Sequence, residues 1–463
     1  MKYIDEAKIN NLLKDAARTA PAELDRILVK TRTLQRLTLA ETAALLAVEE
    51  PERLKSIFAA AAYVKEHIYG SRIVLFAPLY ISNICANCCA YCSFNAKNKM
   101  IERKALTVEE IKEQVQWLLQ RGHKRILMVA GEAAPAGKTN IEYYVESIKA
   151  VYSVNVGPHR IKRVNINCAP LTVDEFKQLK AAGIGTFQIF QETYHEGTYR
   201  QVHTSGPKKD PDNRIDAVDR AFTAGIDDVG IGVLLGLYDY RFEILAMLMH
   251  IEHLEERFKV GPHTISVPRI EPAVGSDLSR NVPYKLTDDN FRKLVAVLRL
   301  AVPYTGIILT TRETAAMRDE LFSLGVSQVS AESRTSPGGY TEGDEALVKD
   351  TQFILNDKRS LDEIIGSLIS KKFIPSFCAA CYRKARTGET FMNLAKPGTI
   401  KGKCSINALI TLKEYLDDFA SPEVKQAGYK LIEECSREFD EKTKAELAKF
   451  FAAVDRGTRD EYV

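Results

Sequence analysis

The chain has 463 residues, 45% of them hydrophobic, and its 64 basic and 61 acidic side chains leave a net charge of +3. A chain of this length can bury a large core, and the length predicts two or three domains or one large α/β barrel with additions. The balanced charge argues against a nucleic-acid partner. No stretch reaches the ~18 consecutive apolar residues of a membrane span, and the N-terminus lacks the basic-then-apolar layout of a secretion signal. We therefore expect a cytoplasmic protein with no membrane partner.

Residues 1–70 carry the pattern of an N-terminal helical extension. Helix-forming residues with apolar side chains at helical spacing predict helices over 4–17, 21–30, 38–47 and 52–70. Thr38 and Glu41 have the spacing of a capping box, which satisfies free N–H groups at the start of a helix. We predict that this segment packs on the main domain.

From residue 71 to residue 340 the pattern changes to alternating strands and helices. Apolar runs predict strands over 73–81, 125–130, 163–167, 186–191, 228–235, 264–270, 306–310 and 328–331. Eight β/α units in regular alternation fit a complete, closed (β/α)8 barrel of the TIM type, an α/β fold, better than an open sheet. In such barrels the catalytic residues stand at the C-terminal ends of the strands, and polar residues follow nearly every predicted strand.

The nine cysteines would be unusual as disulfides in a reducing compartment. Six form two groups with tight spacing, which in a cytosolic protein indicates metal ligation. The groups are Cys85, Cys89 and Cys92, directly after the first predicted strand, and Cys378, Cys381 and Cys404, beyond the barrel. The others, Cys88, Cys168 and Cys435, are expected to be structural. Cys88 offers a second register for the first group, and we prefer Cys89, with Tyr91 directly before the last ligand.

The first group suits an iron–sulfur cluster whose fourth iron has no protein ligand. Three thiolates bind three irons of a 4Fe–4S cube, and an open iron can bind a small molecule. A structural zinc site is the alternative, and it usually recruits a fourth Cys or His nearby. None lies within the next 30 residues, and the nearest histidine is His123. The spacing therefore favours a cluster with one open iron.

The motif Cys85-x3-Cys89-x-Tyr91-Cys92 resembles the signature of the radical S-adenosylmethionine (radical SAM) superfamily. The resemblance implies that SAM chelates the open iron and is cleaved to methionine and a 5′-deoxyadenosyl radical. It also implies that Gly131 and Glu132, after the second strand, meet the SAM amino group, although Ala130 replaces the first glycine of that element. The other implied cofactor-binding residues are Tyr91 and Arg214, Asn165 and Asn167 as ribose contacts, and Gly232 and Gly236, where adenine can approach the backbone.

A substrate pocket for an amino acid is implied by a second resemblance. The segment Gln191-Glu192-Thr-Tyr194, after the fourth strand, is similar to one in the aromatic amino acid lyases of this superfamily. By that resemblance Gln191, Glu192 and Tyr194 line the pocket, and Arg214 meets the SAM carboxylate.

Arg312 and Ser330, at the ends of the seventh and eighth strands, are our candidates for binding the substrate carboxylate. An arginine at a barrel mouth can hold a carboxylate through a bidentate pair. In the resembling lyases an arginine and a serine near these positions have that role. A surface ion pair between Arg312 and Glu313 is the alternative.

The second cysteine group, Cys378-x2-Cys381-x22-Cys404, again offers three thiolates. A structural zinc site with a distant fourth ligand is the alternative. Residues 377–388 resemble the tail of the tyrosine lyases of FeFe-hydrogenase maturation, and that resemblance extends over essentially the whole chain. It implies a second 4Fe–4S cluster in a mostly helical domain over 341–463. It further implies an additional iron, held partly by His263 at the start of the sixth strand.

That family resemblance implies a particular reaction. The enzyme would cleave the Cα–Cβ bond of L-tyrosine to p-cresol and dehydroglycine, and the second cluster would convert dehydroglycine to CO and cyanide bound to iron for the H-cluster of FeFe-hydrogenase. Implied partners are an electron donor such as a flavodoxin or ferredoxin and other hydrogenase maturation proteins. Two clusters at opposite ends of a barrel also require a passage through it, with Asn165, Gln188 and Gln328 as candidate lining residues.

Two other functions remain open on the sequence. A lyase of the thiazole pathway (2-iminoacetate synthase) would release dehydroglycine and use the tail cysteines for a structural metal. A non-enzymatic iron–sulfur scaffold or electron carrier would deliver clusters or electrons. Formation of p-cresol separates both lyases from the carrier, and formation of CO and cyanide separates the two lyases.

Overall fold

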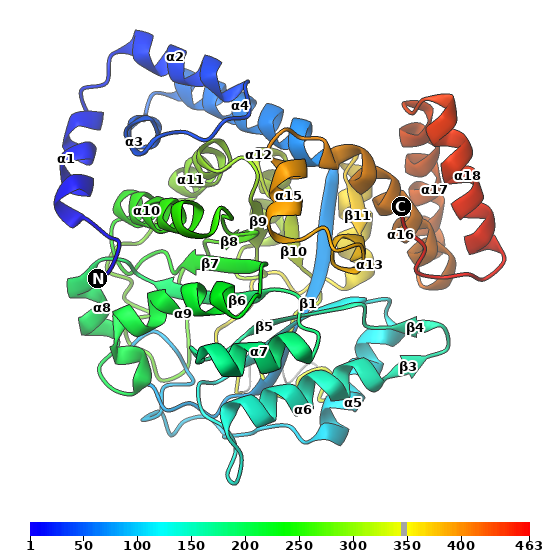
Figure 1. The fold of residues 1–463 in the computed structure, drawn as a ribbon, viewed down its shortest axis with the longest axis horizontal. Helices are drawn as coiled ribbons and strands as arrows, with labels where there is room; N and C mark the ends of the chain where they lie inside the picture. Colours follow the sequence, from blue (N-terminus) through cyan, green and yellow to red (C-terminus); the bar gives the residue numbers. More distant parts are fainter. Residues whose placement is uncertain (344–349) are drawn as a thin grey trace.

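A closed barrel of eight parallel strands forms the centre of the computed structural model, which describes residues 1–343 and 350–463 (Figure 1). Neighbouring strands follow the order β10-β9-β8-β7-β6-β5-β2-β1, and pairing of β1 with β10 closes the ring. The strands are β1 (Arg72–Ser82), β2 (Arg125–Ala130), β5 (Arg163–Asn167), β6 (Phe187–Glu192), β7 (Val229–Val233), β8 (Thr264–Ser266), β9 (Gly306–Leu309) and β10 (Gln328–Ser330). All eight predicted strands are present, and the predicted fold class is confirmed.

The pleat of β1 divides its side chains between the barrel interior and the surrounding helix layer. Outward side chains join the main hydrophobic core: Ile73, Leu75, Ala77, Leu79 and Ile81. Inward side chains line two interior cavities: Arg72 and Val74 the lower one, and Phe76, Pro78 and Tyr80 the upper one. Because both faces are buried, the strand reads in the sequence as one nearly continuous apolar run.

Seven helices of the β/α units surround the barrel in the described part of the chain. They are α5 (Val108–Gln120), α6 (Asn140–Ser153), α7 (Val173–Ala181), α9 (Pro211–Thr223), α10 (Tyr240–Phe258), α11 (Asp288–Ala301) and α12 (Ala315–Leu324). Small elements that the sequence did not predict interrupt the alternation: the hairpin β3 (Asn155–Val156) and β4 (His159–Arg160), the helix α8 (Glu196–Val202) and the 3₁₀ turn η1 (Pro207–Lys209).

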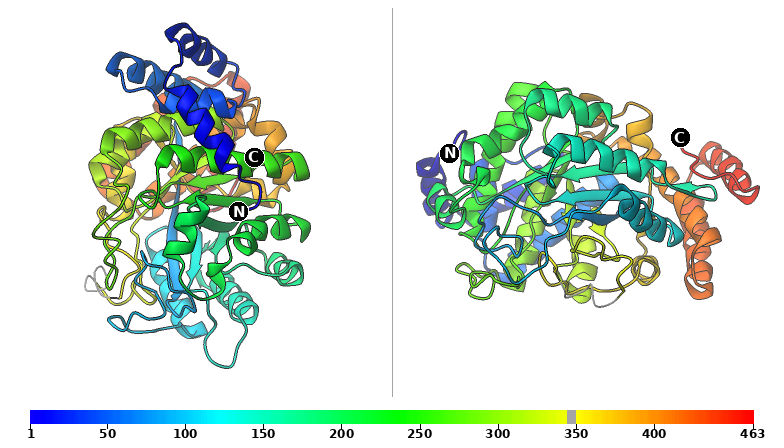
Figure 2. Two further views of the ribbon diagram at one scale, coloured as in Figure 1. Left: turned by 90° about the vertical axis from the view of Figure 1, so that its left-hand side faces the viewer. Right: turned by 90° about the horizontal axis from the view of Figure 1, so that it is seen from below.

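Four N-terminal helices cover one side of the barrel (Figure 2). They are α1 (Glu6–Ala16), α2 (Pro21–Thr31), α3 (Leu39–Leu46) and α4 (Pro51–Tyr69). The capping box of Thr38 and Glu41 is confirmed, since each side chain bonds the other's backbone N–H at the start of α3. The helix α4 packs on α11, and α1 and α3 pack on α10, so the extension adds a second helix layer.

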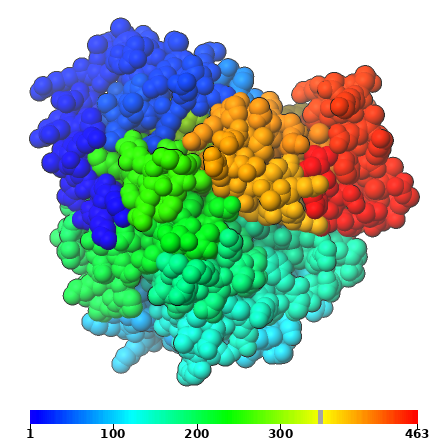
Figure 3. Space-filling view, viewed as in Figure 1, coloured from blue at the N-terminus to red at the C-terminus, as the bar shows by residue number. Residues whose placement is uncertain are grey.

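The C-terminal part attaches to the barrel through an additional strand. Its elements are α13 (Leu361–Ser370), β11 (Ile374–Ser376), α14 (Ala380–Arg383), α15 (Gly388–Ala395), α16 (Ile400–Asp418), α17 (Pro422–Arg437) and α18 (Glu441–Asp455). The unpredicted β11 pairs in parallel with the first residues of β1, Arg72 opposite Ile374. Beyond it α16 packs on β11 and α4, and α17 and α18 project to one side (Figure 3). The domain division at 340/341 stays a prediction, because β11 belongs to the barrel's sheet.

None of the helices in residues 1–343 and 350–463 combines the length and the apolar character that crossing a bilayer requires.

Candidate active site and second metal centre

The cluster loop, residues 85–92, begins three residues after β1, at the barrel end where such enzymes place catalytic groups. It pairs with the last residue of α8 and the chain that follows it. The N–H of Cys88 donates to the carbonyl of Ser205 (3.0 Å), and the N–H of Ala90 donates to the carbonyl of Val202 (2.9 Å). This short ladder fixes the position of the loop on the barrel.

The thiols of Cys85, Cys89 and Cys92 lie close enough to interact electrostatically. Burial raises the pKa of Cys89 to about 12 and that of Cys92 to about 11; Lys208 lowers both, and the neighbouring thiolates of this group raise them. The choice of Cys89 over Cys88 as a ligand stays a prediction. Coordination to iron deprotonates a thiol, so a bound cluster would overcome these shifts.

The surroundings of the thiols fit an iron–sulfur cluster. The backbone N–H of Asn87 points at Cys85 Sγ (3.5 Å), and the amide of Gln352 points at Cys92 Sγ (3.8 Å). Such hydrogen bonds to sulfur favour the ligating thiolate and tune the potential of a cluster. Within the described residues no three His, Cys, Asp or Glu side chains converge on a single metal ion. Thiolates that bind separate irons of a cube do not need to converge.

Gly131, at the end of β2, holds the start of the cluster loop from the other side. Its N–H donates to the carbonyl of Ser82 (2.8 Å). A Cβ atom at this position would lie 2.1 Å from the carbonyl oxygen of Ile84. Only glycine permits this approach of two backbones.

Two buried cations and two half-buried carboxylates form a network beside the cluster loop. Arg214 Nη1 lies 2.7 Å from Glu132 Oε1, and Lys208 Nζ lies 2.7 Å from Glu192 Oε1. Asn87 joins the network to the loop by donating from Nδ2 to Glu132 Oε2 (2.7 Å). Burial raises the pKa of Glu132, but Arg214 and Lys208 outweigh it and hold that pKa below its ordinary value. The network therefore presents fixed charges next to the thiols.

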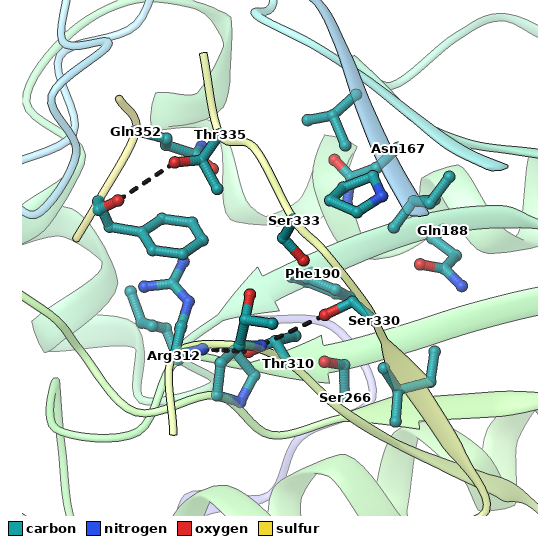
Figure 4. A pocket seen from close by; sticks show the side chains of 18 of the residues that line it. Asn167, Gln188, Phe190, Ser266, Thr310, Arg312, Ser330, Ser333, Thr335 and Gln352 are labelled. Atoms are coloured by element: carbon teal, nitrogen blue, oxygen red, sulfur yellow. Dashed lines mark hydrogen bonds between the residues drawn. The ribbon is translucent and has the colours of Figure 1, made fainter. Parts of the chain in front are cut away.

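A cavity of about 130 Å³ opens at the C-terminal ends of the strands, where Figure 4 shows polar and aromatic side chains from several strands directed into it. We call it the upper cavity. Of the predicted site residues it is lined by Tyr91, Cys92, Asn167, Glu192, Arg312 and Ser330. One space thus brings together the cluster loop and candidates for cofactor and substrate.

Arg312 enters the upper cavity beside an aromatic ring. Its guanidinium carbon lies 3.3 Å from the ring centroid of Phe353. The alternative prediction, an ion pair between Arg312 and Glu313, is wrong, because Glu313 pairs with Arg269 (2.9 Å). Within residues 1–343 and 350–463 no carboxylate forms an ion pair with Arg312; burial lowers its pKa, and Glu192 and Glu271 offset this only in part. It is therefore open to an incoming carboxylate.

The predictions that Gln191 and Tyr194 line the pocket are corrected. Gln191 donates from Nε2 to the carbonyl of Pro211 (3.1 Å), and the hydroxyl of Tyr194 lies 2.9 Å from His250 Nδ1. The pleat of β6 explains the first case: Gln188, Phe190 and Glu192 face the cavity, so Gln191 faces the helix layer.

Asn165, Gly232 and Gly236 make close contacts within the barrel itself. Asn165 accepts the N–H of Thr186 (3.0 Å) and lines neither cavity, so its predicted ribose contact is corrected, whereas Asn167 lines the upper cavity. A Cβ at Gly232 would lie 2.3 Å from the Ser266 carbonyl, and one at Gly236 2.6 Å from Val282. The contacts of these glycines with adenine stay predictions.

A second cavity, of about 40 Å³, lies at the opposite, N-terminal end of the barrel, and we call it the lower cavity. Its lining includes all four predicted tail ligands, Cys378, Cys381, Cys404 and His263, together with Arg72 and Arg125. The pairing of β11 with β1 brings the tail to this end. Burial raises the pKa of Cys381 to about 12, and the two neighbouring thiols add to the rise. The backbone N–H of Ala380 points at Cys378 Sγ (3.4 Å), so this donor set also fits a three-thiolate cluster.

His263 stands at the foot of β8, against the ring of Phe391 (4.2 Å between centroids). Its Nδ1 lies 3.7 Å from Asp228 Oδ2. Both carboxylate oxygens of Asp228 are buried without a hydrogen-bond partner in the described residues. A carboxylate facing Nδ1 leaves Nε2 available to a metal, and burial lowers the pKa of His263, which favours the neutral, ligating form. Its bond to an additional iron stays a prediction.

The sequence analysis assigned no role to Asn87, Gln352, Phe353 or Arg125. Asn87 carried a usable signal, since it is a polar residue enclosed between cluster cysteines. Gln352 and Phe353 lie beyond the last barrel strand and belong to no motif. Arg125 reads as an ordinary charged residue before a strand, and only the fold directs it toward the tail cysteines.

Comparison with known proteins agrees with this geometry. The radical SAM superfamily profile matches residues 79–250, and the biotin and thiamin synthesis associated domain matches residues 266–374. A crystal structure of HydG, a maturase of the FeFe-hydrogenase, is 45% identical, with all of both chains covered and a TM-score of 0.96. HydG from Carboxydothermus hydrogenoformans is 41% identical over 96% of this chain and 97% of its own, with a TM-score of 0.83. The 2-iminoacetate synthase of Escherichia coli is 29% identical over 340 residues, 73% of this chain and 86% of the relative.

A closed barrel with a three-cysteine loop after its first strand defines a radical SAM enzyme, which uses a 4Fe–4S cluster and SAM. The identity to both solved relatives extends over the tail that carries the second cysteine group. The chain belongs to the HydG family, and with that family it has a second cluster.

Proposed function

We propose that this protein cleaves the Cα–Cβ bond of L-tyrosine to p-cresol and dehydroglycine, and converts dehydroglycine to CO and cyanide for the active-site cluster of FeFe-hydrogenase. The observation that carries the proposal is a pair of three-thiol sites at opposite ends of one closed barrel. The relatives support both halves: HydG is a hydrogenase maturase, and 2-iminoacetate is another name for dehydroglycine.

The upper cavity suits an aromatic amino acid. Arg312 offers a planar fork of donors to the carboxylate, and Phe353 holds the plane of that fork. Ser330 adds a hydroxyl, whose oxygen already accepts the N–H of Thr311 (3.3 Å). Tyr80 and Phe190 supply apolar walls for a phenol ring. A carboxylate bound here would be largely removed from water, which strengthens its pairing with the guanidinium.

The chain's share of the chemistry is to hold tyrosine and to exclude water. The first cluster and SAM, when bound, would supply a 5′-deoxyadenosyl radical able to abstract a hydrogen atom from the tyrosine amino group. The carboxylate contacts fix the amino group and the Cα–Cβ bond beside the cofactor, where a small displacement costs a large factor in rate. The mostly apolar lining keeps competing water away from the reactive intermediates.

A passage for the two-carbon product is supported by the layering of the barrel interior. Successive inward residues of one strand line the two cavities: Val74 the lower and Phe76 the upper on β1, and Gln328 the lower and Ser330 the upper on β10. Only one layer of side chains therefore separates the two sites. Gln188 lines the upper cavity, so two of the three predicted lining residues border the passage.

Anaerobically reconstituted protein with SAM, dithionite and tyrosine tests the proposal. We expect p-cresol, then CO and cyanide, and an iron content of about eight or more per chain for two clusters. Without p-cresol the lyase activity is refuted. With p-cresol but neither CO nor cyanide, the protein acts as a 2-iminoacetate synthase, and its tail metal is structural.

The Cys378→Ser/Cys381→Ser variant separates the two sites. It should keep p-cresol formation and lose CO, because the upper cavity contains neither residue. Equal loss of both products would show that the tail only supports the structure. A flavodoxin or ferredoxin in place of dithionite, and hydrogenase maturation proteins as acceptors, are the partners that this function requires.

A further inference from the structure

The turn after β6 presents Glu192 to the upper cavity in an unfavourable backbone conformation. Glu192 has a φ of +70°, in the left-handed region that residues other than glycine avoid. The register with β7 also shifts between Phe190 and Glu192. The carboxylate nevertheless has a definite place, 2.7 Å from Lys208 Nζ. Such a conformation persists only where its surroundings hold it.

Glu243 of α10 holds this turn from the helix layer. Its Oε2 accepts the N–H of Tyr194 (2.8 Å), and its Oε1 is hydrogen-bonded to the hydroxyl of Thr193. The oxygen of Thr193 in turn accepts the N–H of His195 (3.2 Å). All three residues that follow Glu192 are thus connected to one carboxyl group. Glu243 is fully buried, and no cation pairs with it in residues 1–343 and 350–463.

The environment of Glu243 keeps it a neutral acid. Burial raises its pKa to about 8, and the hydrogen bonds from Thr193 and Tyr194 lower it by less. The titratable groups around it are Asp239, which caps its own helix, Tyr238 just before that helix, Glu6 of α1, and the Tyr194 and His250 pair. The two carboxylates oppose its ionisation, and burial keeps the pair uncharged by raising the pKa of Tyr194 and lowering that of His250 to about 3. The Thr193 hydroxyl and the Tyr194 N–H both donate to the carboxyl, and a neutral carboxyl can accept both hydrogen bonds.

We propose that Glu243 is a positioning residue for the lyase reaction: its carboxyl clamps the turn 192–195 and thereby sets the place of Glu192 in the upper cavity. It lines neither cavity and acts only through the turn. The inference deepens the proposed function and uses its assay. What the turn requires is a pair of hydrogen bonds, one with the Thr193 hydroxyl and one with the Tyr194 N–H, and not a charge.

A pair of substitutions separates hydrogen bonding from charge and size. Glu243→Gln keeps one donor and one acceptor and should retain p-cresol formation. Glu243→Ala should lower kcat on the order of 10- to 100-fold, the factor expected for a small misplacement in a reacting site. It should also raise the ratio of 5′-deoxyadenosine to p-cresol. Glu252→Ala on the same helix, where the side chain contacts Arg36, is the matched control and should behave as wild type.

A double-mutant cycle identifies the path of the effect. If Glu243 acts through Glu192, the losses in Glu243→Ala and Glu192→Gln should be far from additive. Additive losses would overturn the proposal, as would a Glu243→Gln variant as impaired as Glu243→Ala. Rates are compared per iron-loaded, folded chain. If Glu243→Ala does not fold, Thr193→Val removes one contact only and should give a smaller loss of the same kind.

Thermal unfolding at several pH values tests the clamp without any turnover. Glu243 has a folded pKa of about 8 against an ordinary value of 4.5, so its contribution to stability is full below pH 4.5 and is lost as the pH rises toward 8. Wild type should therefore lose stability relative to Glu243→Gln over that range. Equal pH profiles would show that Glu243 ionises as an ordinary carboxylate and would overturn the inference that the clamp is neutral. If wild type forms no p-cresol while the profiles differ, the lyase function fails and the clamp does not.

Discussion

Single side chains at the upper cavity take their positions from neighbours that belong to no sequence motif. Phe353 sets the plane of Arg312, and the carbonyl of Ile84 leaves room only for glycine at position 131. Their chemistry was predictable from residue type and from their place after a strand. Their contacts were not, because each partner comes from a different part of the chain.

Arg312 should determine tyrosine binding. Arg312→Gln is expected to lower kcat/KM for tyrosine by about 10- to 100-fold, because a charged hydrogen-bonded pair contributes roughly 1.5–3 kcal/mol. Arg312→Lys should lose less, since it keeps the charge without the planar fork. Arg292→Gln, which removes a half-buried arginine paired with Glu320 away from both cavities, is the control. A loss confined to kcat, with KM unchanged, would contradict a role in binding the carboxylate.

Gly131 should be required for the first cluster. In Gly131→Ala the new Cβ would have to displace the Ile84 carbonyl, which it would otherwise approach to 2.1 Å, and with it the start of the cluster loop. We expect the variant to lose iron from the first cluster in iron and sulfide analysis. Gly402→Ala, on α16 with nothing near the new Cβ, should keep its iron and gain up to about 1 kcal/mol of stability. Full iron content in Gly131→Ala would refute the assignment.

Two secondary-structure elements without a catalytic motif decide where the tail cysteines lie. The strand β11 continues the sheet beside β1, and α16 carries Cys404 over the foot of the barrel. A three-residue strand is too short to stand out by periodicity, and its partner is some 300 residues earlier in the chain. The helix α16 was predictable as a helix, but not its contact with the barrel.

The buried pair of Lys124 and Glu414 should hold α16 in place. Lys124 precedes β2, and both side chains are almost fully removed from water. Lys124→Met would leave the Glu414 charge unpaired and should cost about 3–5 kcal/mol in urea unfolding. Iron should be lost from the second cluster before the first. Lys124→Met/Glu414→Leu should recover most of the stability, and a single variant as stable as wild type would contradict the pairing.

The whole molecule is organised as two chemical sites on one barrel axis. The upper cavity receives residues from the C-terminal ends of the strands, and the lower cavity receives the tail. Between them the interior is polar and partly without side chains, because Gly230 and Gly306 occupy inward positions. An ordinary barrel fills this layer with bulky side chains. The unusual filling supports communication between the sites.

Gly306→Val should close the passage. Its Cβ would lie 2.6 Å from Gln328 Nε2, so the valine would crowd the layer between the cavities. We expect p-cresol formation to continue and CO formation to fall steeply. The ratio of CO to p-cresol in one reaction is the measurement, and an unchanged iron content excludes loss of the second cluster. An unchanged ratio would show that dehydroglycine does not pass this layer.

The sequence by itself determined the fold class, because strand and helix periodicity and cysteine spacing are local properties that can be read along the chain. It also predicted six cysteines as two sets of cluster ligands and pointed to the strand ends that carry Glu132, Asn167, Glu192 and Arg312. Only the tertiary structure decided which of these groups share a cavity. The pleat of β6 decides which side chains face the upper cavity, and it excludes Gln191. A bulge and a positive φ direct Glu192 into that cavity. The strand β11 brings the tail to the N-terminal end of the barrel. These are long-range contacts, and they are settled by packing over the whole chain.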